Sequence, residues 1–215
     1  MGYITVKQEA MDEFEERKSL FIGYTKRVET EDDAKAFINV IKSKHKDATH
    51  NVYAYIVGQN LEIQRYSDDG EPQGTAGIPI LEVIKKSGVT DCVVVVTRYF
   101  GGILLGAGGL VRAYTKGASM AIKEAGLVEK VDGLLLRIII DYDLLGKIQY
   151  ICNQNQWYIE DTQYTDKVEL NIYCELTLRD TIEKQIVEAT NGKAIIVKEQ
   201  EGIFFKEGNR LYKNI

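Results

Sequence analysis

The sequence contains few prolines and cysteines and no long apolar run. It has two prolines and three cysteines in 215 residues. Cys92, Cys152 and Cys174 are an odd number of cysteines, far apart, with no CxxC pair, which argues against a disulfide framework and a zinc site. The apolar run from Cys92 to Val96 is far too short to span a bilayer. We therefore expect a soluble cytoplasmic protein with no membrane partner, no metal and no cofactor.

The sequence also lacks an excess of basic residues. Lys and Arg number 27 against 32 Asp and Glu, so the formal net charge is -5. Domains that bind nucleic acid through electrostatics usually carry a clear basic excess, and we expect no binding to DNA. Any contact with RNA must come from a local patch. Hydrophobic residues make up 45% and charged residues 27%, which is typical of a chain that folds throughout.

Two glycine-rich segments bracket one apolar strand in the middle of the chain. The first is SDDGEPQGTAGIP, from Ser67 to Pro79, and the second is RYFGGILLGAGGLVRAY, from Arg98 to Tyr114. Glycine permits positive φ and close approach of the backbone, so such loops suit contact with a ligand or with another chain. Packing of each loop on the strand would explain the glycines equally well.

The second segment fits neither standard phosphate-binding motif. A phosphate-binding loop requires Lys and then Ser or Thr where Ala107 and Gly108 stand. A dinucleotide fingerprint requires a third glycine where Val111 stands. What remains is general: backbone amides at the start of a helix near Gly108 could accept an anion, with help from Arg98 and Arg112.

Three carboxylates stand close together in the first segment. Asp68, Asp69 and Glu71 could form a metal or acid/base cluster, but an Asp and Gly turn with solvated carboxylates is the favoured interpretation. If the two segments meet in space, Asp69 or Glu71 could pair with Arg98 or Arg112. Such a pair could be structural, since buried charges are usually paired.

The order of elements predicts an α/β (α+β) protein with two domains, residues 1–130 and 131–215. The first should hold a mostly antiparallel sheet that begins with a hairpin of 3–6 and 19–28, and a helix begins after Thr30. A later helix should bury Val111, Tyr114, Ala118, Ile122 and Ala125. The second domain should start near Val131, within a boundary segment at Val128–Gly133. Its expected order is strand 134–140, helix 144–153, strands 157–161 and 168–176, helix 181–190 and strand 194–197, the ferredoxin-like βαββαβ pattern.

The motifs SDDGEPQGTAG and VVVTRYFGGILLGAGGLVRAY resemble the signature of the IMPACT family, including its YigZ-type bacterial members. The resemblance covers about residues 15–126, with Ala107 where Thr is usual, and the C-terminal part resembles the second domain of the bacterial proteins. It implies an N-terminal domain similar to domain IV of elongation factor G and to the second domain of a small-subunit ribosomal protein. The C-terminal domain would be similar to domain V of the same factor.

The family resemblance further implies association with RNA or the ribosome and a regulatory role, with no established reaction. We expect a non-enzymatic binding protein whose partner is RNA, the ribosome or a translation-related protein. Alternatives are a small-molecule enzyme acting on a phosphorylated or nucleotide substrate, and a protein-interaction module. Catalytic residues are not assigned, and the oligomeric state is left open. The candidate binding residues are Asp68, Asp69, Glu71, Arg98, Tyr99, Gly106, Gly108, Gly109 and Arg112.

Overall fold

The computed structural model describes residues 2–214, and these divide into two compact units. The N-terminal unit, Tyr3–Val128, contains a five-stranded sheet in the order β2-β3-β6-β4-β5, in which all neighbouring strands are antiparallel. The predicted α/β class and the antiparallel sheet are thereby confirmed. Its elements are β1 (Tyr3–Val6), β2 (Ala10–Glu16), β3 (Ser19–Arg27), α1 (Glu31–Lys44), β4 (His50–Val57), β5 (Ile63–Ser67), α2 (Gly77–Lys86), β6 (Cys92–Tyr99) and α3 (Ala107–Ala125).

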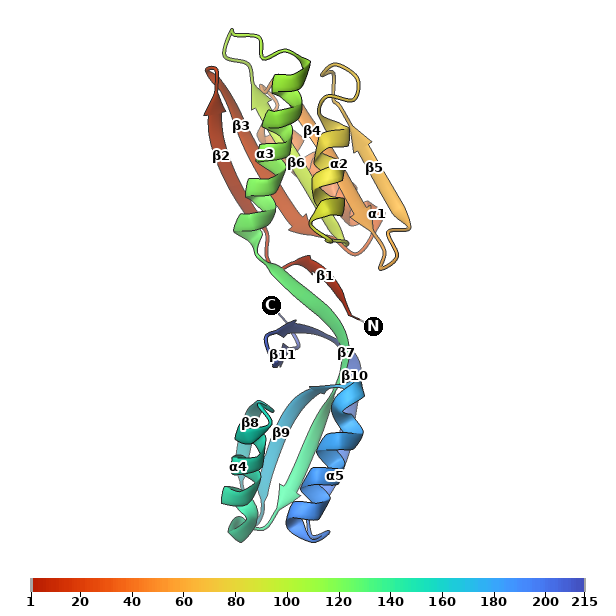
Figure 1. Ribbon diagram of the computed structural model, residues 1–215, viewed down its shortest axis with the longest axis vertical. Helices are drawn as coiled ribbons and strands as arrows, with labels where there is room; N and C mark the ends of the chain where they lie inside the picture. The colour runs from red at the N-terminus through yellow and green to blue at the C-terminus, as the bar shows by residue number, and fades with distance from the viewer. Residues whose placement is uncertain (1, 215) are drawn as a thin grey trace. The chain divides into compact units, whose positions relative to one another are not determined.

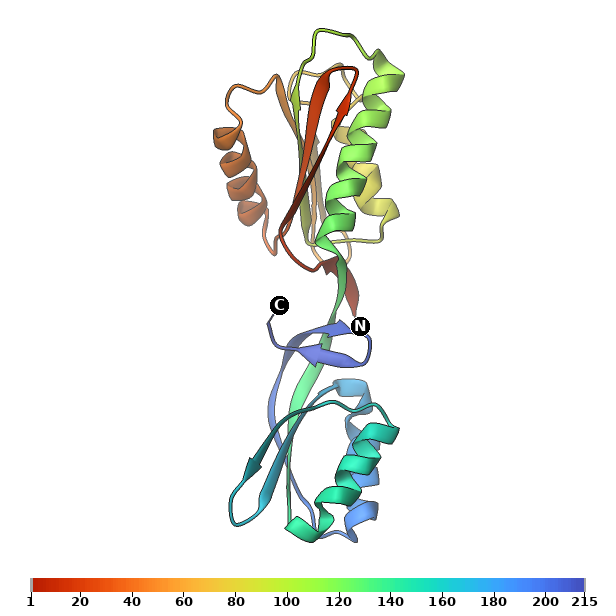
Figure 2. The same ribbon diagram turned by 90° about the vertical axis from the view of Figure 1, so that its left-hand side faces the viewer.

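The central strand β6 is covered on both faces, as its run of valines predicts. Val94 and Val96 belong to the core beneath α2 and α3, whereas Val93 and Val95 face the core beneath α1. Figures 1 and 2 show α1 on one side of the sheet and α2 with α3 on the other. Because side chains alternate along a strand, consecutive residues of β6 reach different sides of the sheet.

Local sequence explains where the helices begin. Thr30 and Asp33 form a reciprocal capping box at α1: the Thr30 side chain accepts from the Asp33 backbone, and Asp33 accepts from the Thr30 backbone. Pro79 lies in the first turn of α2, where its missing N–H costs nothing. Gly88 follows that helix with φ of 67°, the left-handed conformation that commonly ends a helix.

Helix α3 packs against β3 at unusually short range because glycines face each other. A Cβ built on Gly23 would lie 2.3 Å from the carbonyl oxygen of Gly117 in α3. Any larger residue at Gly23 would push the helix away from the sheet. This contact fixes the position of α3, whose first turn lies beside the candidate site.

Two predictions for this unit are wrong. The hairpin partner of Ser19–Arg27 is Ala10–Glu16 and not Tyr3–Val6. The sequence AMDEFEE of β2 is acidic because this strand lies at the edge of the sheet with one face in solvent, which hides its strand character. Tyr114, Ala118, Ile122 and Ala125 of α3 are buried as predicted, but Val111 is exposed, and Leu110 is the buried residue in the first turn of the helix.

The C-terminal unit, from Glu129 onward, has the predicted βαββαβ order and a sheet in the order β10-β7-β9-β8, typical of the ferredoxin-like fold. Its core includes Ile138, Ile148, Leu170 and Ile186. Figure 2 shows α4 and α5 on the same face of this sheet. The elements are β7 (Leu127–Ile140), α4 (Leu145–Gln154), β8 (Ile159–Tyr164), β9 (Val168–Glu175), α5 (Arg179–Thr190), β10 (Ile195–Glu207) and β11 (Arg210–Tyr212), with single 3-10 turns at Tyr142–Leu144 and Leu176–Leu178.

Two strands of this unit, β7 and β10, are longer than predicted. β7 begins at Leu127 and not at Leu134, so it runs through the predicted boundary segment. β10 continues to Glu207 and pairs with β11, which the sequence pattern did not predict. A bulge between Lys198 and Glu201 interrupts the pairing of β10 with β7, and this break in alternation explains why the prediction ended β10 at Val197.

Candidate functional site

The first glycine-rich segment is organised by Asp68. Its Oδ1 accepts from the backbone N–H groups of Ala76 (3.1 Å) and Gly77 (2.8 Å), and its Oδ2 accepts from that of Gly74 (2.9 Å). The carboxylate therefore satisfies donors at the start of α2, which are otherwise left without partners at a helix N-terminus. Asp68 shapes the segment 67–76, which we call the acidic loop.

Glu71 is buried, so the interpretation of this loop as a turn with solvated carboxylates is wrong for it. Its side chain is 3% exposed, and Oε1 accepts from Arg98 Nη1 and from the Tyr114 hydroxyl, both at 2.7 Å. The predicted meeting of the two glycine-rich segments, through a carboxylate and an arginine, is confirmed by this pair. Burial and the hydrogen bond to Glu71 raise the pKa of Tyr114 above its ordinary value, so the hydroxyl stays a neutral donor.

Arg98 is held between aromatic rings on the α3 side of β6. Its guanidinium carbon lies 5.5 Å from the ring centre of Phe21 and 5.4 Å from that of Phe100. The side chain is 6% exposed, and Nε has no hydrogen-bond partner within residues 2–214. Because Glu71 neutralises this cation, the buried pair presents little net charge to an anion.

Asp69 joins the acidic loop to α1 and β4. Oδ1 accepts from Lys42 Nζ and Oδ2 from the backbone N–H of Asn51, both at 2.7 Å. The carbonyl oxygen of Asp69 lies 2.8 Å from His50 Nδ1. Asp69 has φ of 46°, a conformation that Asp tolerates better than most residues. Its contacts anchor the loop.

Tyr99 lies on the opposite face of the sheet from Arg98. Its hydroxyl is 2.9 Å from His45 Nδ1, and His45 Nε2 is 2.7 Å from the hydroxyl of Tyr24. Burial, with a smaller contribution from the charge of Lys44, lowers the pKa of His45 below its ordinary value. Tyr99 therefore belongs to a structural network under α1 and not to the surface formed by the other candidates.

A pocket of about 420 Å³ lies where the two glycine-rich segments meet. Its polar side is formed by Glu71, His50 and Arg98, and its apolar side by Phe100 and residues 104–107. Leu104 is 79% exposed and Phe100 45% exposed, so large apolar side chains border the opening. We call this cavity the Glu71 pocket.

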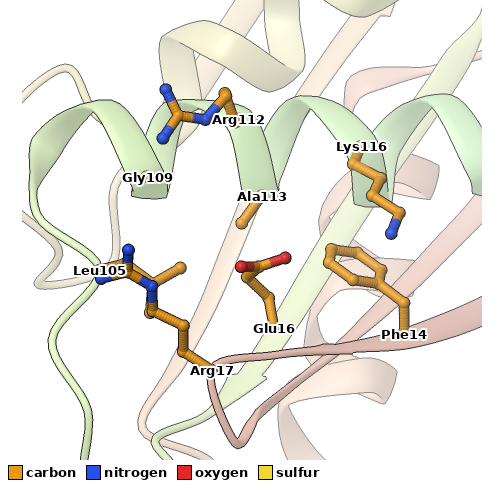
Figure 3. A pocket seen from close by; sticks show the side chains of 8 residues that line it. All are labelled: Phe14, Glu16, Arg17, Leu105, Gly109, Arg112, Ala113 and Lys116. Atoms are coloured by element: carbon orange, nitrogen blue, oxygen red, sulfur yellow. The ribbon is translucent and has the colours of Figure 1, made fainter.

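A second pocket, of about 260 Å³, lies between α3 and the end of β2. Figure 3 shows Arg17, Arg112 and Lys116 around it, with the carboxylate of Glu16 in their midst. Lys116 Nζ lies 4.1 Å from the ring centre of Phe14. Within residues 2–214, none of the three cations forms an ion pair with a carboxylate. We call this cavity the Arg112 pocket.

The loop that links the two pockets is the segment 100–106, which we call the Phe100 loop. Arg17 Nη1 donates to the carbonyl oxygen of Leu104 at 3.3 Å, and the backbone N–H of Gly101 donates to Ser19 Oγ at 3.1 Å. The turn between β2 and β3 thus supports this loop. Leu105 lines both pockets, so the pockets are adjacent.

The three candidate glycines around the start of α3 differ in how strictly the structure requires glycine. Gly106 precedes the helix with φ of 71°, a conformation that other residues rarely adopt. A Cβ on Gly109 would lie 2.9 Å from Cβ of Leu105, so a small residue is needed there. A Cβ on Gly108 would meet only the end of Arg112, at 3.8 Å. Gly106 borders the Glu71 pocket and Gly109 the Arg112 pocket.

Other chemical groups of the described chain give no second candidate centre. Burial raises the pKa of Cys92 and Cys174 to about 12 and that of Cys152 to about 11, so these thiols stay protonated. In residues 2–214, no three His, Cys, Asp or Glu side chains are grouped so that they could hold a metal ion. None of the helices described is both long and apolar enough to cross a membrane.

Sequence reasoning missed several residues of the site. Tyr114 looked like a core residue only, His50 showed no motif, and Arg17 lies before either glycine-rich segment. A correct prediction of the β2–β3 hairpin would have placed Arg17 at a turn near the end of β6. No feature of the sequence marks His50, because its partners come from the distant acidic loop.

Comparison with known proteins finds a matching family model in each of the two units. Residues 17–122 match the family model described as the Impact N-terminal domain, and residues 138–193 match a domain of unknown function, DUF1949. The chain is similar to IMPACT family member YvyE of Bacillus subtilis, with 45% identity over 91% of this chain and 90% of that protein. IMPACT family member YigZ of Escherichia coli is 36% identical over 73% of this chain and 78% of its own length.

A solved structure and more distant relatives agree with these matches. A crystal structure of a hypothetical protein is 28% identical, with a TM-score of 0.58 over 93% of this chain and 98% of that chain. The protein IMPACT homologue of Dictyostelium discoideum is 40% identical over 42% of this chain and 27% of its own length. The similarity to YvyE extends across both units, and the chain belongs to the IMPACT family.

Proposed function

We propose that this protein is a cytoplasmic, non-enzymatic binding protein that associates with the ribosome by contacting RNA phosphates. The observation that carries the proposal is the Arg112 pocket, where Arg17, Arg112 and Lys116 converge without an ion pair in the described residues. With Glu16 included, three positive charges and one negative charge give the pocket a formal charge of +2. Phosphate oxygens are the natural partners of such a cluster.

The remaining charges near the pocket favour binding over catalysis. Asp68 accepts three backbone N–H groups, Asp69 is engaged by Lys42, and Glu71 is engaged by Arg98. These carboxylates hold loops in place, so none of the three is free of structural contacts, as a carboxylate acting as general acid or base would be. The exposed cations of the Arg112 pocket form no ion pair in the described residues, although Arg17 also donates to the carbonyl oxygen of Leu104. This difference supports a surface that acts by attraction and position.

The net charge of -5 limits the strength of such binding. Only a local patch can offset the general repulsion of RNA, and three phosphate contacts on a single strand predict a slope of log affinity against log salt of about -2. We therefore expect an association that is measurable at low salt and is weakened strongly at physiological salt. Additional contacts with a ribosomal protein would reduce this sensitivity.

The test is co-sedimentation with purified ribosomes at two salt concentrations. We expect the double variant Arg112→Ala, Lys116→Ala to sediment with ribosomes several-fold less than the wild type at low salt, because two phosphate contacts are lost. The matched control is Lys86→Ala, Lys123→Ala, which removes the same charge from the exposed ends of α2 and α3 in the same unit. This control should bind like the wild type.

Thermal unfolding of each variant shows whether a loss of binding is a loss of folding. Equal co-sedimentation of the wild type and the Arg112, Lys116 variant would contradict the proposal. Loss of binding in both double variants would assign the effect to net charge and not to the pocket. Binding that resists salt and persists after nuclease digestion of the exposed ribosomal RNA would point to a protein partner instead.

A further inference from the structure

The Glu71 pocket has a feature that its structural contacts leave unexplained: a carboxylate oxygen of Glu71 and a ring nitrogen of His50 lie near each other without a hydrogen bond. Glu71 Oε1 is occupied by Arg98 and Tyr114, but Oε2 lies 3.8 Å from Nε2 of His50. That separation is too long for a direct hydrogen bond. The two atoms border the same cavity of about 420 Å³.

The backbone decides which nitrogen of His50 carries the proton. Nδ1 lies 2.8 Å from the carbonyl oxygen of Asp69, and a carbonyl oxygen can only accept. Nδ1 is therefore the N–H donor, and in the neutral ring Nε2 presents a lone pair. Glu71 Oε2 and His50 Nε2 thus call for a ligand that brings N–H donors between or beside them.

The apolar part of the pocket lining suits a flat, apolar face. The Phe100 ring is 45% exposed at the opening and lies 5.4 Å from the Arg98 guanidinium, which is itself planar. Leu104, 79% exposed, and Pro72 border the same cavity. A heteroaromatic ring could stack on Phe100 while its edge reaches the two acceptors, as unpaired bases do in RNA-binding proteins.

We propose that the Glu71 pocket binds an unpaired nucleobase that presents adjacent N–H donors, and that guanine fits best. Guanine offers a ring N–H and an exocyclic amino group side by side on one edge, which matches two neighbouring acceptors. Uracil offers a single ring N–H, and the Watson–Crick edge of adenine offers only its amino group as a donor.

The position of the pocket connects the base to a phosphate site. Leu105 lines both the Glu71 pocket and the Arg112 pocket. Gly106 and Ala107, at the start of α3, border the Glu71 pocket, and the first N–H groups of that helix have no intrahelical partner. A base in one pocket would place its own or the adjoining phosphate toward these donors and toward Arg112. This inference rests on the proposed function where the base belongs to an RNA strand.

Binding of labelled single-stranded RNA hexamers provides the test. Each hexamer consists of uridines with guanosine, inosine, adenosine or uridine at one central position, so that charge and length are equal. We expect the guanosine hexamer to bind about tenfold more tightly than the uridine hexamer, as for one well-formed base contact. Inosine lacks the amino group and should fall between them. Guanosine monophosphate, added as a competitor, tells whether the free nucleotide also occupies the pocket.

Variants at the rim leave Glu71 and Arg98, the two partners of the buried ion pair, unsubstituted. Phe100→Ala should reduce affinity for the guanosine hexamer about tenfold through lost stacking. His50→Gln should remove the preference for guanosine over inosine. The matched control is Ile103→Ala, an exposed apolar residue of the same loop that does not line the pocket. Thermal unfolding confirms that each variant is folded.

The outcomes separate this inference from the proposed function. Equal affinity for all four hexamers, with salt dependence and loss of binding in Arg112→Ala, Lys116→Ala, would overturn the base pocket and leave the phosphate site standing. A guanosine preference that survives Phe100→Ala and His50→Gln would place the base elsewhere and overturn the inference too. Guanosine preference lost in both rim variants and retained in Ile103→Ala would support it.

Discussion

Arg98 and Arg112 look alike in the sequence and differ completely in the structure. Both belong to the second glycine-rich segment, and both were candidate anion ligands. Arg98 is buried, paired with Glu71 at 2.7 Å and enclosed by Phe21 and Phe100. Arg112 lies exposed on α3 beside Arg17 and Lys116, with no ion pair in the described chain. One arginine holds two loops together, and the other is available to a ligand.

The difference between the two arginines shows that counting charged residues in a loop does not give the charge that is exposed to a binding partner. A residue from another part of the sequence meets each arginine: Glu71 of the acidic loop pairs with Arg98, whereas Arg17 from the β2–β3 turn lines the same pocket as Arg112. Burial makes a paired charge structural, because removing either partner leaves the other charged group without compensation.

The largest expected effect is on stability and distinguishes the two arginines directly. Arg98→Met should lower the free energy of unfolding by about 3–5 kcal/mol, because Glu71 stays buried without its cation. Arg112→Met should change it by no more than about 0.5 kcal/mol, as is usual for an exposed site. Urea unfolding of the two variants measures both values. Similar losses for the two would contradict the assignment of separate roles.

Substitution by alanine should also affect stability differently at Gly101 of the Phe100 loop and at Gly108 of α3. A Cβ on Gly101 would lie 2.0 Å from the backbone of Lys18, so Gly101→Ala should cost about 1–3 kcal/mol through forced displacement of the β2–β3 turn. Gly108→Ala should be neutral or stabilise α3 by up to about 1 kcal/mol, since alanine favours helix and space is available. Chemical denaturation compares the two, and tolerance of alanine at Gly101 would show that the loop can leave its support.

A smaller effect concerns the other face of β6, where Tyr99 contacts His45. Because burial lowers the folded pKa of His45 below its ordinary value of 6.5, the unfolded chain takes up the proton first as pH falls. The stability from neutral His45 is complete above about pH 6.5 and is lost as pH falls through the folded pKa. We expect the thermal midpoint of the wild type to decline below that pH.

The control for this pH effect uses the fact that the chain has only two histidines. His45→Gln keeps groups that can hydrogen-bond with Tyr24 and Tyr99 but removes the titration, so it should flatten the decline between pH 7 and 5.5. His50→Gln should leave the decline unchanged if His45 is its source. A decline that disappears only in His50→Gln would reverse this assignment.

Much of the fold could be predicted from local sequence. The capping residues Thr30 and Asp33, the valines of β6 and the C-terminal βαββαβ order each depend on neighbours along the chain or on simple periodicity. β2 escaped prediction because its acidic, edge-strand sequence shows little apolar alternation. The end of β10 escaped because a bulge breaks its period.

The sequence predicted which loops form the candidate site, but it did not predict the role of each residue in it. The glycine pattern and the charges correctly indicated that Glu71 and Arg98 meet. Burial could not be inferred, because it depends on Phe21 and Tyr114 from β3 and α3. The contribution of Arg17 depends on a hairpin that was assigned to another strand, and Tyr99 was grouped with Arg98 although side chains alternate across a strand.

The central claim is that exposed cations of the Arg112 pocket, and not the buried Arg98, bind phosphates. The most direct measurement is the salt dependence of affinity for a single-stranded RNA, for the wild type and for Arg112→Gln, Lys116→Gln. We predict a slope of log affinity against log salt of about -2 for the wild type and about -0.7 for the variant, because one contact remains at Arg17. Equal slopes for the two proteins would contradict the account.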